Sequence, residues 1–286
     1  MQPAIFQEIK KCSHAEKLPD GSPYQGIGVK DVVRLAAMFH MPGRQIEVIA
    51  LEHGIIPVRY ARNRMTYSSE EQIRLLRAHA AVVGQGGLGG ILVETLARAG
   101  VGELTLIDAD RFEDHNLNRQ QFSSEAVLGQ SKALCAAQRI ALVNSSVVVH
   151  THSERLQADN AGRLLGSADV AVDCLDNIAT RFTVQEAARK LQRPFVSAAV
   201  GGLAGHITTI LPGDEGLELI YGPPDELKSA SGAEATLGCL PQAVNLIAAL
   251  QASQVLKVLA GHTRLLRNRL MLVDLSDDTV QVLQLR

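Results

Sequence analysis

Two neighbouring stretches of the chain carry the residue types that phosphate chemistry needs. The first is the run GQGGLG, Gly84 to Gly89, which satisfies the pattern G-x-G-x-x-G. Glycines at this spacing allow backbone N–H groups and a helix N-terminus to approach a phosphate without intervening side chains. Gly84, Gly86, Gly87 and Gly89 are therefore predicted to cradle a nucleotide phosphate.

The second stretch, DADRFEDHNLNRQQF, spans residues 108–122. Asp108 stands at the end of an expected strand, where a carboxylate accepts hydrogen bonds from ribose hydroxyls. More polar side chains follow than a ribose requires: Asp110, Asn116, Asn118, Arg119 and Gln120. A delocalised cation that clamps phosphate oxygens fits a triphosphate better than the bridging diphosphate of NAD.

Two further segments add charge at the same sheet edge. Lys132, in GQSK, begins the next expected helix and points at the phosphate end. The run 173–177, DCLDN, ends a later strand, where a carboxylate beside a triphosphate is a natural Mg²⁺ ligand. Asp176 is the predicted metal ligand with Asn177 beside it, and Asp173 is predicted to cap a turn. Two cations, a metal-binding acid and a glycine cradle indicate phosphoryl or nucleotidyl transfer rather than hydride transfer.

The elements that must position these side chains alternate between strands and helices from residue 80 onward. Buried strands are expected at 80–84, 104–108, 147–153, 169–175 and 194–200, with helices at 90–100, 131–143 and 179–191. A strand at 203–211, a loop at 212–236, a helix at 240–261 and a hairpin over 270–285 follow. This order predicts an α/β fold: a doubly wound, mostly parallel, Rossmann-like sheet with C-terminal antiparallel strands and ligands at its carboxyl ends.

Residues 1–58 are predicted to form a small helical appendage ahead of the nucleotide-binding domain at 59–286. Its first 28 residues are polar and irregular, and two short helices are expected at 29–41 and 43–54. A DNA-binding helix-turn-helix is an alternative. The second helix, however, opposes Arg44 with Glu47 and Glu52, which is a poor set of charges for approaching phosphates.

Composition sets further bounds. The 286 residues carry a net charge of −2, which gives no general attraction to nucleic acid or an anionic membrane. No apolar run approaches the roughly 20 residues that span a bilayer, and the N-terminus lacks the order of a secretory signal. The four cysteines are far apart with no C-x-x-C pair, so we expect a cytoplasmic protein without disulfides or structural zinc. Cys239, near a helix start, is interpreted as a core residue, with a reactive thiol as the alternative.

In combination, GQGGLG, LARAGVGELTLIDADRFEDHNLNRQ, GQSKA and VDCLDNIATRF resemble the ThiF/MoeB/HesA adenylyltransferases, relatives of the ubiquitin-activating enzymes, over about residues 59–260. The resemblance implies a homodimer that uses Mg-ATP to adenylate the C-terminal glycine of a ubiquitin-like, ThiS/MoaD-like sulfur carrier ending in Gly-Gly. The acyl adenylate then passes to a sulfur donor supplied by another protein. Because the two C-x-x-C pairs of zinc-bearing relatives are absent, the resemblance is to a zinc-free branch.

The resemblance also implies roles for individual residues. Gly84 to Gly89 cradle the nucleotide, Asp108 holds the ribose, and Asp176 is the metal-linked acid. In RYARN, Arg62 matches an arginine that is donated to the ATP of the partner subunit. The residues that surround the phosphates are Asp110, Asn116, Arg119, Gln120 and Lys132.

Three alternatives remain open at this point. The glycine motif by itself permits an NAD(P)-dependent oxidoreductase. A non-catalytic scaffold could bind the carrier without consuming ATP, although the intact set of Arg119, Lys132 and Asp176 argues against it. A carboxyl-activating tRNA-modification enzyme shares these motifs, although the mild acidity of the chain argues against a nucleic-acid substrate.

Overall fold

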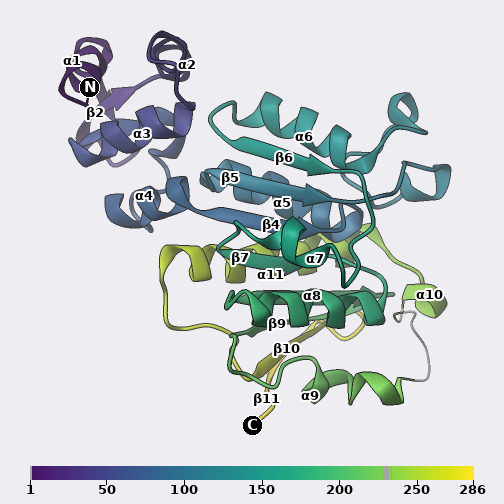
Figure 1. The fold of residues 1–286 in the computed structure, drawn as a ribbon. Coiled ribbons are helices and arrows are strands. Elements are labelled where there is room, and N and C mark those ends of the chain that lie inside the picture. The colour runs from purple at the N-terminus through teal and green to yellow at the C-terminus, as the bar shows by residue number, and fades with distance from the viewer. Residues whose placement is uncertain (1, 228–231, 233) are drawn as a thin grey trace.

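The computed structural model describes residues 2–227, 232 and 234–286, and its centre is an eight-stranded sheet (Figure 1). The strand order is β11-β10-β9-β8-β7-β4-β5-β6. The five strands from β8 to β6 run parallel, and β9, β10 and β11 extend the sheet in antiparallel fashion. The predicted fold class is confirmed. The strands are β4 (His79–Val83), β5 (Glu103–Ile107), β6 (Val148–His152), β7 (Val170–Asp173), β8 (Phe195–Gly201), β9 (Ala204–Ile210), β10 (Arg269–Asp274) and β11 (Thr279–Gln284).

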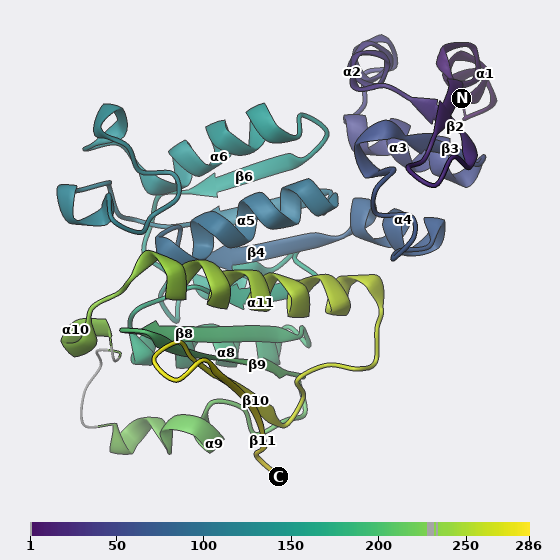
Figure 2. The ribbon, with the colours of Figure 1, turned by 180° about the vertical axis from the view of Figure 1, so that it is seen from behind.

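Helices cover both faces of the sheet, as the two views show (Figures 1 and 2). One layer contains α5 (Gly87–Ala99), α6 (Lys132–Val143) and α11 (Pro241–Ala260), and the other contains α7 (Ala161–Leu165) and α8 (Ile178–Lys190). All five residues of β4 are buried, which explains why residues 80–83 are continuously apolar rather than alternating. The sequence reasoning did not identify α7, which is only five residues long.

Helix α11 corrects the expectation that no apolar run is long enough to span a bilayer. By length and composition alone, its 20 residues could cross a membrane. However, 61% of an apolar 18-residue window of this helix is buried inside the protein. Val244, Ile247 and Ala248 belong to the same core cluster as Leu92 and Leu96 of α5. The apolar composition of α11 is therefore explained by burial between α5 and the sheet.

The N-terminal region contains the two predicted helices but is not purely helical. Residues 1–28 were expected to be irregular, whereas the structure forms a first helix and two strands there. Ile5 and Ile9, four residues apart, are the only fully buried apolar side chains of that first helix, so its sequence shows little periodicity. The elements are α1 (Gln2–Cys12), β1 (His14–Lys17), β2 (Pro23–Ile27), α2 (Val29–Met38), α3 (Gly43–Glu52) and β3 (Ile55–Pro57), with the sheet order β1-β2-β3.

A linker segment joins this region to the sheet at the amino ends of the parallel strands (Figure 1). It contains η1 (Val58–Tyr60) and α4 (Ser69–Arg77). The sequence SSEE signals the start of α4, because Ser68 and Glu71 form a capping box, a signal that the sequence reasoning missed. The remaining short helices are η2 (Asp114–Asn116), η3 (Glu125–Val127), α9 (Glu218–Tyr221), η4 (Pro224–Glu226) and α10 (Glu234–Leu237). The last three show that the predicted loop 212–236 contains helical turns, and part of it lies outside the described residues.

A buried polar cluster fixes the N-terminal region to the nucleotide-binding domain. Glu47 of α3 is fully buried, with its carboxylate 3.3 Å from the Arg59 Nε and accepting a hydrogen bond of 3.4 Å from the Tyr60 hydroxyl. Asn144, at the end of α6, donates to the Tyr60 hydroxyl and to the carbonyl of Ala97 in α5. Burial raises the pKa of the Glu47 carboxyl to about 7, against the lowering effect of Arg59.

This raised pKa makes the contribution of Glu47 to stability depend on pH. The carboxyl titrates near 4.5 when unfolded and near 7 when folded, so its contribution is complete below pH 4.5 and is lost as the pH rises through 7. As the pH rises between those limits, we expect the free energy of unfolding of wild type to fall by about 3 kcal/mol. Glu47→Gln has no carboxyl at this position and should not show this fall. Urea unfolding of both proteins at pH 5 and pH 8 measures this difference. Glu52→Gln, on the same helix but at the surface, is the control, and parallel pH profiles for wild type and Glu47→Gln would contradict the prediction.

Candidate nucleotide-binding site

A cavity of about 340 Å³ opens at the carboxyl ends of β4, β5 and β7. The carboxyl ends of these strands point away from the N-terminal region (Figure 1). The structure brings most of the sequence-predicted residues to the wall of the cavity: Gly84, Gly86, Gly87, Asp108, Asp110, Arg119, Gln120, Lys132, Asp176 and Asn177. The proximity follows from the fold, because parallel strands place their carboxyl ends at one edge.

Some glycines of the turn are required by the backbone conformation, and another leaves space for a phosphate. Gly84 has a φ of +95°, and a Cβ on Gly89 would lie 1.9 Å from the Gly84 carbonyl oxygen, so both positions require glycine for the fold itself. A Cβ on Gly86 would meet nothing closer than the Gln120 amide at 3.4 Å, which is an ordinary contact. The protein leaves the space above Gly86 open, as the close approach of a phosphate requires.

Two alanine substitutions are therefore expected to have different results. Gly86→Ala should fold with a melting temperature close to wild type but bind ATP much more weakly, because the new methyl group occupies the phosphate space. Gly89→Ala should lose stability, by roughly 1–3 kcal/mol or more, because the methyl group overlaps a backbone carbonyl. Thermal unfolding and ATP titration by calorimetry separate the two effects. Tight ATP binding by folded Gly86→Ala would show that no phosphate approaches this turn.

Asp108 is held rigidly beneath the turn. Its Oδ2 accepts a hydrogen bond of 2.6 Å from the Gln85 amide, and its Oδ1 accepts one of 2.8 Å from the Asp110 amide. Burial raises the pKa of the Asp108 carboxyl, and these two backbone donors oppose the rise. The carboxylate thus links the glycine turn to the following loop and lines the cavity where a ribose is expected.

Cations and an unsatisfied amide line the phosphate side of the cavity. Lys132, the first residue of α6, is only 7% exposed, and its Nζ lies 3.4 Å from the Asp110 carboxylate. Arg119 donates to the His115 carbonyl at 2.9 Å and to the Asn118 side chain at 2.8 Å, which orients its guanidinium. Gln120 is 93% buried, and its amide oxygen has no partner among the described residues. Such a group fits a site that a ligand completes.

The loop after β7 separates a structural acid from an exposed one. Asp173 is fully buried, accepts from Arg181 at 2.8 Å and from Ser197 at 2.7 Å, and caps the turn at the Leu175 amide. Burial raises the pKa of Asp173, against the lowering effect of Arg181. Asp176, three residues on, is exposed at the cavity wall. Asn177 caps α8 by accepting from the Thr180 amide at 2.9 Å.

Four predicted residues are not among those that line this cavity, and one of them is Gly89, which the fold itself requires. Asn116 is buried, and its side chain accepts from the Glu113 amide within η2. Asn118 donates to the Cys239 carbonyl, which connects this loop to the start of α11. Arg62 is exposed, does not line this cavity, and lies in the linker segment between η1 and α4, which precedes the amino end of β4. Its predicted role requires a second subunit and stays a prediction.

Sequence reasoning missed two residues of the site. Arg181, within the quoted motif VDCLDNIATRF, is almost completely buried and lines the cavity. Asp173 ends β7 and Arg181 lies in the first turn of α8, so no helical spacing in the sequence links the two residues. Cys239 also lines the cavity, although the sequence favoured a core position. Among residues 2–227, 232 and 234–286, no group of three or more His, Cys, Asp or Glu side chains is arranged to hold a metal ion. The absence of zinc stays a prediction.

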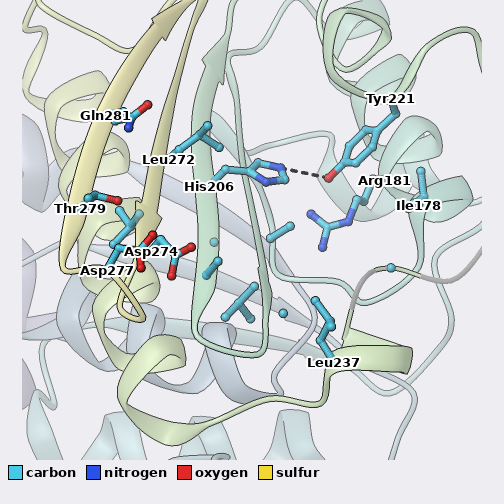
Figure 3. A pocket seen from close by; sticks show the side chains of 17 residues that line it. Ile178, Arg181, His206, Tyr221, Leu237, Leu272, Asp274, Asp277, Thr279 and Gln281 are labelled. Carbon is cyan, nitrogen blue, oxygen red and sulfur yellow. Dashed lines mark hydrogen bonds between the residues drawn. The ribbon is translucent and has the colours of Figure 1, made fainter.

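A second cavity, of about 450 Å³, adjoins the first (Figure 3). Arg181 and Val200 line both cavities. Its floor is formed by β8, β9 and the β10–β11 hairpin, and its other walls come from α8, α9 and α10. His206 of β9 and Tyr221 of α9 share a hydrogen bond of 3.1 Å across it. Burial and, to a smaller extent, Arg181 lower the pKa of His206 to about 4, so the imidazole is neutral at physiological pH.

Comparisons with known proteins show the family of this chain. The family model described as ThiF family matches residues 60–286. The adenylyltransferase and sulfurtransferase MOCS3 of Drosophila willistoni is 34% identical over 223 residues, which cover 76% of this chain and 48% of the relative. MOCS3 of Danio rerio is 34% identical over 234 residues, covering 80% and 50% respectively. The chain therefore spans about half the length of the curated relatives that it matches.

Solved structures share the fold over nearly the whole chain. Selenomethionine PaaA superposes with a TM-score of 0.66 at 18% identity, covering 96% of this chain and 99% of PaaA. Escherichia coli MccB solved with ATP gives 0.69 at 21% identity, covering 90% and 79%. MccB solved with selenomethionine MccA gives 0.67 at 19% identity, covering 97% and 96%. The family match includes the glycine turn, both acidic strand ends and every residue that lines the nucleotide cavity, and this chain therefore belongs to the ThiF family.

Proposed function

We propose that this protein is an adenylyltransferase that uses Mg-ATP to activate the C-terminal carboxylate of a small ubiquitin-like sulfur carrier ending in Gly-Gly. The observation that carries the proposal is the junction of the two cavities at Arg181 and Val200. A polypeptide end that enters the second cavity would therefore lie next to the nucleotide cavity. Membership in the ThiF family and the likeness to MOCS3 support the same activity.

The proposed reaction is a displacement at the α-phosphate. A carboxylate oxygen forms a bond to the α-phosphorus, the bond from that phosphorus to the oxygen bridging to the β-phosphate breaks, and pyrophosphate leaves with the electron pair. A terminal carboxylate has a pKa of roughly 3.5 and is already ionised at neutral pH, so the step needs no general base. Positioning and charge neutralisation then account for catalysis.

The residues of the nucleotide cavity can supply both the positioning and the charge neutralisation. The open space above Gly86 and the unpartnered Gln120 oxygen fit bound phosphates. Lys132 and Arg119 supply positive charge on the phosphate side, and Asp110 and the His115 carbonyl orient them. Asp176 would hold Mg²⁺ together with phosphate oxygens, since Mg²⁺ commonly takes only one or two protein carboxylates in such sites. When bound, the ion neutralises charge that develops on the leaving pyrophosphate.

The partners follow from the same proposal. The enzyme acts as a homodimer in which Arg62 reaches the ATP of the partner subunit. The segment 212–236 contains no cysteine that could take the activated carboxylate, so the acyl adenylate passes to a separate sulfur-donor protein. Cys239 lines the nucleotide cavity, but adenylation itself uses no thiol.

Exchange of labelled pyrophosphate into ATP tests the function. A carrier ending in Gly-Gly should support exchange, the same carrier with an amidated C-terminus should not, and Cys239→Ser should keep the activity. Binding of NAD with no exchange would favour an oxidoreductase, and carrier binding without exchange would favour a scaffold. Exchange that requires a modified tRNA instead of a carrier would identify a tRNA-modifying activity.

A linear peptide is a second candidate for the substrate. The observation that favours it is the match of nearly the whole chain, including the N-terminal region, to MccB solved with MccA. The ThiF family model, by contrast, begins at residue 60. The same exchange assay, run with short unstructured peptides that have free C-termini, distinguishes a peptide substrate from a folded carrier.

A further inference from the structure

The buried side of helix α11 is apolar except for two glutamines, Gln251 and Gln254. Gln251 is fully buried, and its Nε2 donates a hydrogen bond of 2.6 Å to the carbonyl of Asp173, the last residue of β7, and one of 3.3 Å to the carbonyl of Val196 in β8. Its Oε1 accepts a hydrogen bond of 3.5 Å from the Cys174 thiol. Burial raises the pKa of this thiol, so it stays protonated and can donate. Because a buried amide is costly unless it is hydrogen-bonded, these contacts fix Gln251 to the end of β7.

The segment that Gln251 holds lies between the glycine turn and Asp176. Cys174 packs against the turn: a Cβ on Gly84 would lie 2.5 Å from the Cys174 carbonyl oxygen, and a Cβ on Gly89 would lie 3.5 Å from the Cys174 Cβ. Asp176 follows two residues later and is exposed at the wall of the nucleotide cavity. A shift of this strand end would therefore move Asp176 relative to the phosphate space above the turn.

Helix α8, on the other face of the sheet, holds the same segment. Arg181 of α8 donates to the Asp173 carboxylate at 2.8 Å and to the Leu175 carbonyl. The Asp173 carboxylate in turn accepts a hydrogen bond of 2.9 Å from the Leu175 amide. The backbone is thus fixed from both helical layers up to Leu175, immediately before the exposed acid. A carboxylate that binds a metal ion needs support of this kind, because its own position decides the geometry of the site.

We infer that Gln251 is a positioning residue of the nucleotide site, which fixes the end of β7 so that Asp176 can bind the magnesium ion of Mg-ATP. Gln251 lines neither of the two cavities, so it acts through Asp173 and Cys174 and not on the nucleotide itself. Partners that restrain a metal-binding side chain in this way strengthen its affinity for the metal. The inference rests on the proposed function only for the presence of Mg-ATP, and it makes no use of the carrier.

Gln254, one turn further along α11, is the matched control. It is 5% exposed, and its Oε1 accepts hydrogen bonds from the Leu266 amide at 3.0 Å and the Thr209 hydroxyl at 3.3 Å. These partners belong to β9 and to the segment before β10, and Gln254 lines neither cavity. Gln251→Met and Gln254→Met each remove a buried amide at similar side-chain volume, so both should lower the melting temperature. Only Gln251→Met should change the response to magnesium.

The experiment measures the Kd of ATP by calorimetry without any carrier, once with Mg²⁺ and once with EDTA. In wild type, Mg²⁺ should tighten ATP binding. Gln251→Met should weaken binding roughly tenfold in Mg²⁺ and leave the Kd in EDTA close to that of wild type, because the lost restraint concerns the metal-binding acid. Gln254→Met should keep both wild-type values. The inference is overturned if Gln251→Met keeps the wild-type ratio of the two Kd values, whether both are unchanged or both are weakened equally.

A double variant tests whether Gln251 acts through Asp176. Asp176→Ala should remove the effect of Mg²⁺ on ATP binding, and adding Gln251→Met should then change that effect no further. A further loss in the double variant, or wild-type ATP binding that does not depend on Mg²⁺, contradicts the inference. If Gln251→Met does not fold, Gln251→Asn replaces it with the same expected direction. Its amide is one methylene shorter and cannot reach the carbonyls of both strands together.

These outcomes differ from a failure of the proposed function. Loss of the Mg²⁺-dependent part of ATP binding in Gln251→Met supports the inference even if no carrier supports pyrophosphate exchange, in which case only the adenylation proposal fails. Carrier-dependent exchange together with an unchanged Mg²⁺ response in Gln251→Met supports adenylation and overturns the positioning role of Gln251.

Discussion

Asp176→Ala is expected to retain the fold and lose carrier-dependent pyrophosphate exchange by roughly 150-fold or more. A single electrostatic contact to the transition state contributes about 3 kcal/mol, which corresponds to that factor. Asp176 is exposed at the cavity wall, and its side chain has no hydrogen bond or ion pair within the described part of the chain, so its removal costs the fold little. Arg119→Ala should lose exchange to a similar extent, because the guanidinium is oriented toward the phosphate side.

Controls separate this effect from unfolding. Asp159→Asn removes an exposed acid outside both cavities and should leave exchange unchanged. Asp173→Asn, in contrast, disturbs the buried pair with Arg181 and should lower the melting temperature as well as the activity. Measurements of kcat, KM and thermal unfolding on all four variants distinguish these cases. Undiminished exchange in folded Asp176→Ala and Arg119→Ala would remove both residues from the catalytic site.

Mixing Arg62→Ala with Asp176→Ala is expected to recover activity from two inactive proteins. Arg62 lies in the linker segment that precedes the amino end of β4, whereas the nucleotide cavity lies at the carboxyl ends of β4, β5 and β7, so a role for Arg62 in catalysis requires the partner's site. In a mixed dimer one site then contains intact Arg62 and intact Asp176, and the other contains both substitutions. Random exchange of subunits makes half of the dimers mixed, so roughly a quarter of wild-type activity should return.

The measurement is pyrophosphate exchange after subunit swapping, with heterodimers confirmed by mass spectrometry of differently tagged chains. Arg64→Ala is the control, because Arg64 is exposed in the same segment and should be active without mixing. If Arg62 acts within its own chain, every site in the mixture keeps one lesion and no activity returns. That outcome, or a protein that remains monomeric at assay concentrations, would reject the crossed arrangement.

The sequence by itself determined the α/β alternation and most of the nucleotide cavity. The glycine run, Asp108, Lys132 and Asp176 each follow a strand or begin a helix, so a parallel sheet brings them together whatever the details of packing. Local signals were sufficient because these residues act through backbone geometry and position at strand ends. The capping box at Ser68 and Glu71 was equally local, and it was missed only because α4 lies outside the alternating pattern.

Tertiary structure alone decided the rest. The strands β1 and β2 are short and largely exposed, so no alternation of apolar residues marks them. Asn116 resembles a ligand in its position, but buried polar groups need partners and its amide is used by η2. The second cavity combines residues from α8, β9, α9 and β10 that are far apart in the chain. Their meeting depends on the register of antiparallel strands and on the positions of α9 and α10, and neither is encoded in the spacing of any single motif.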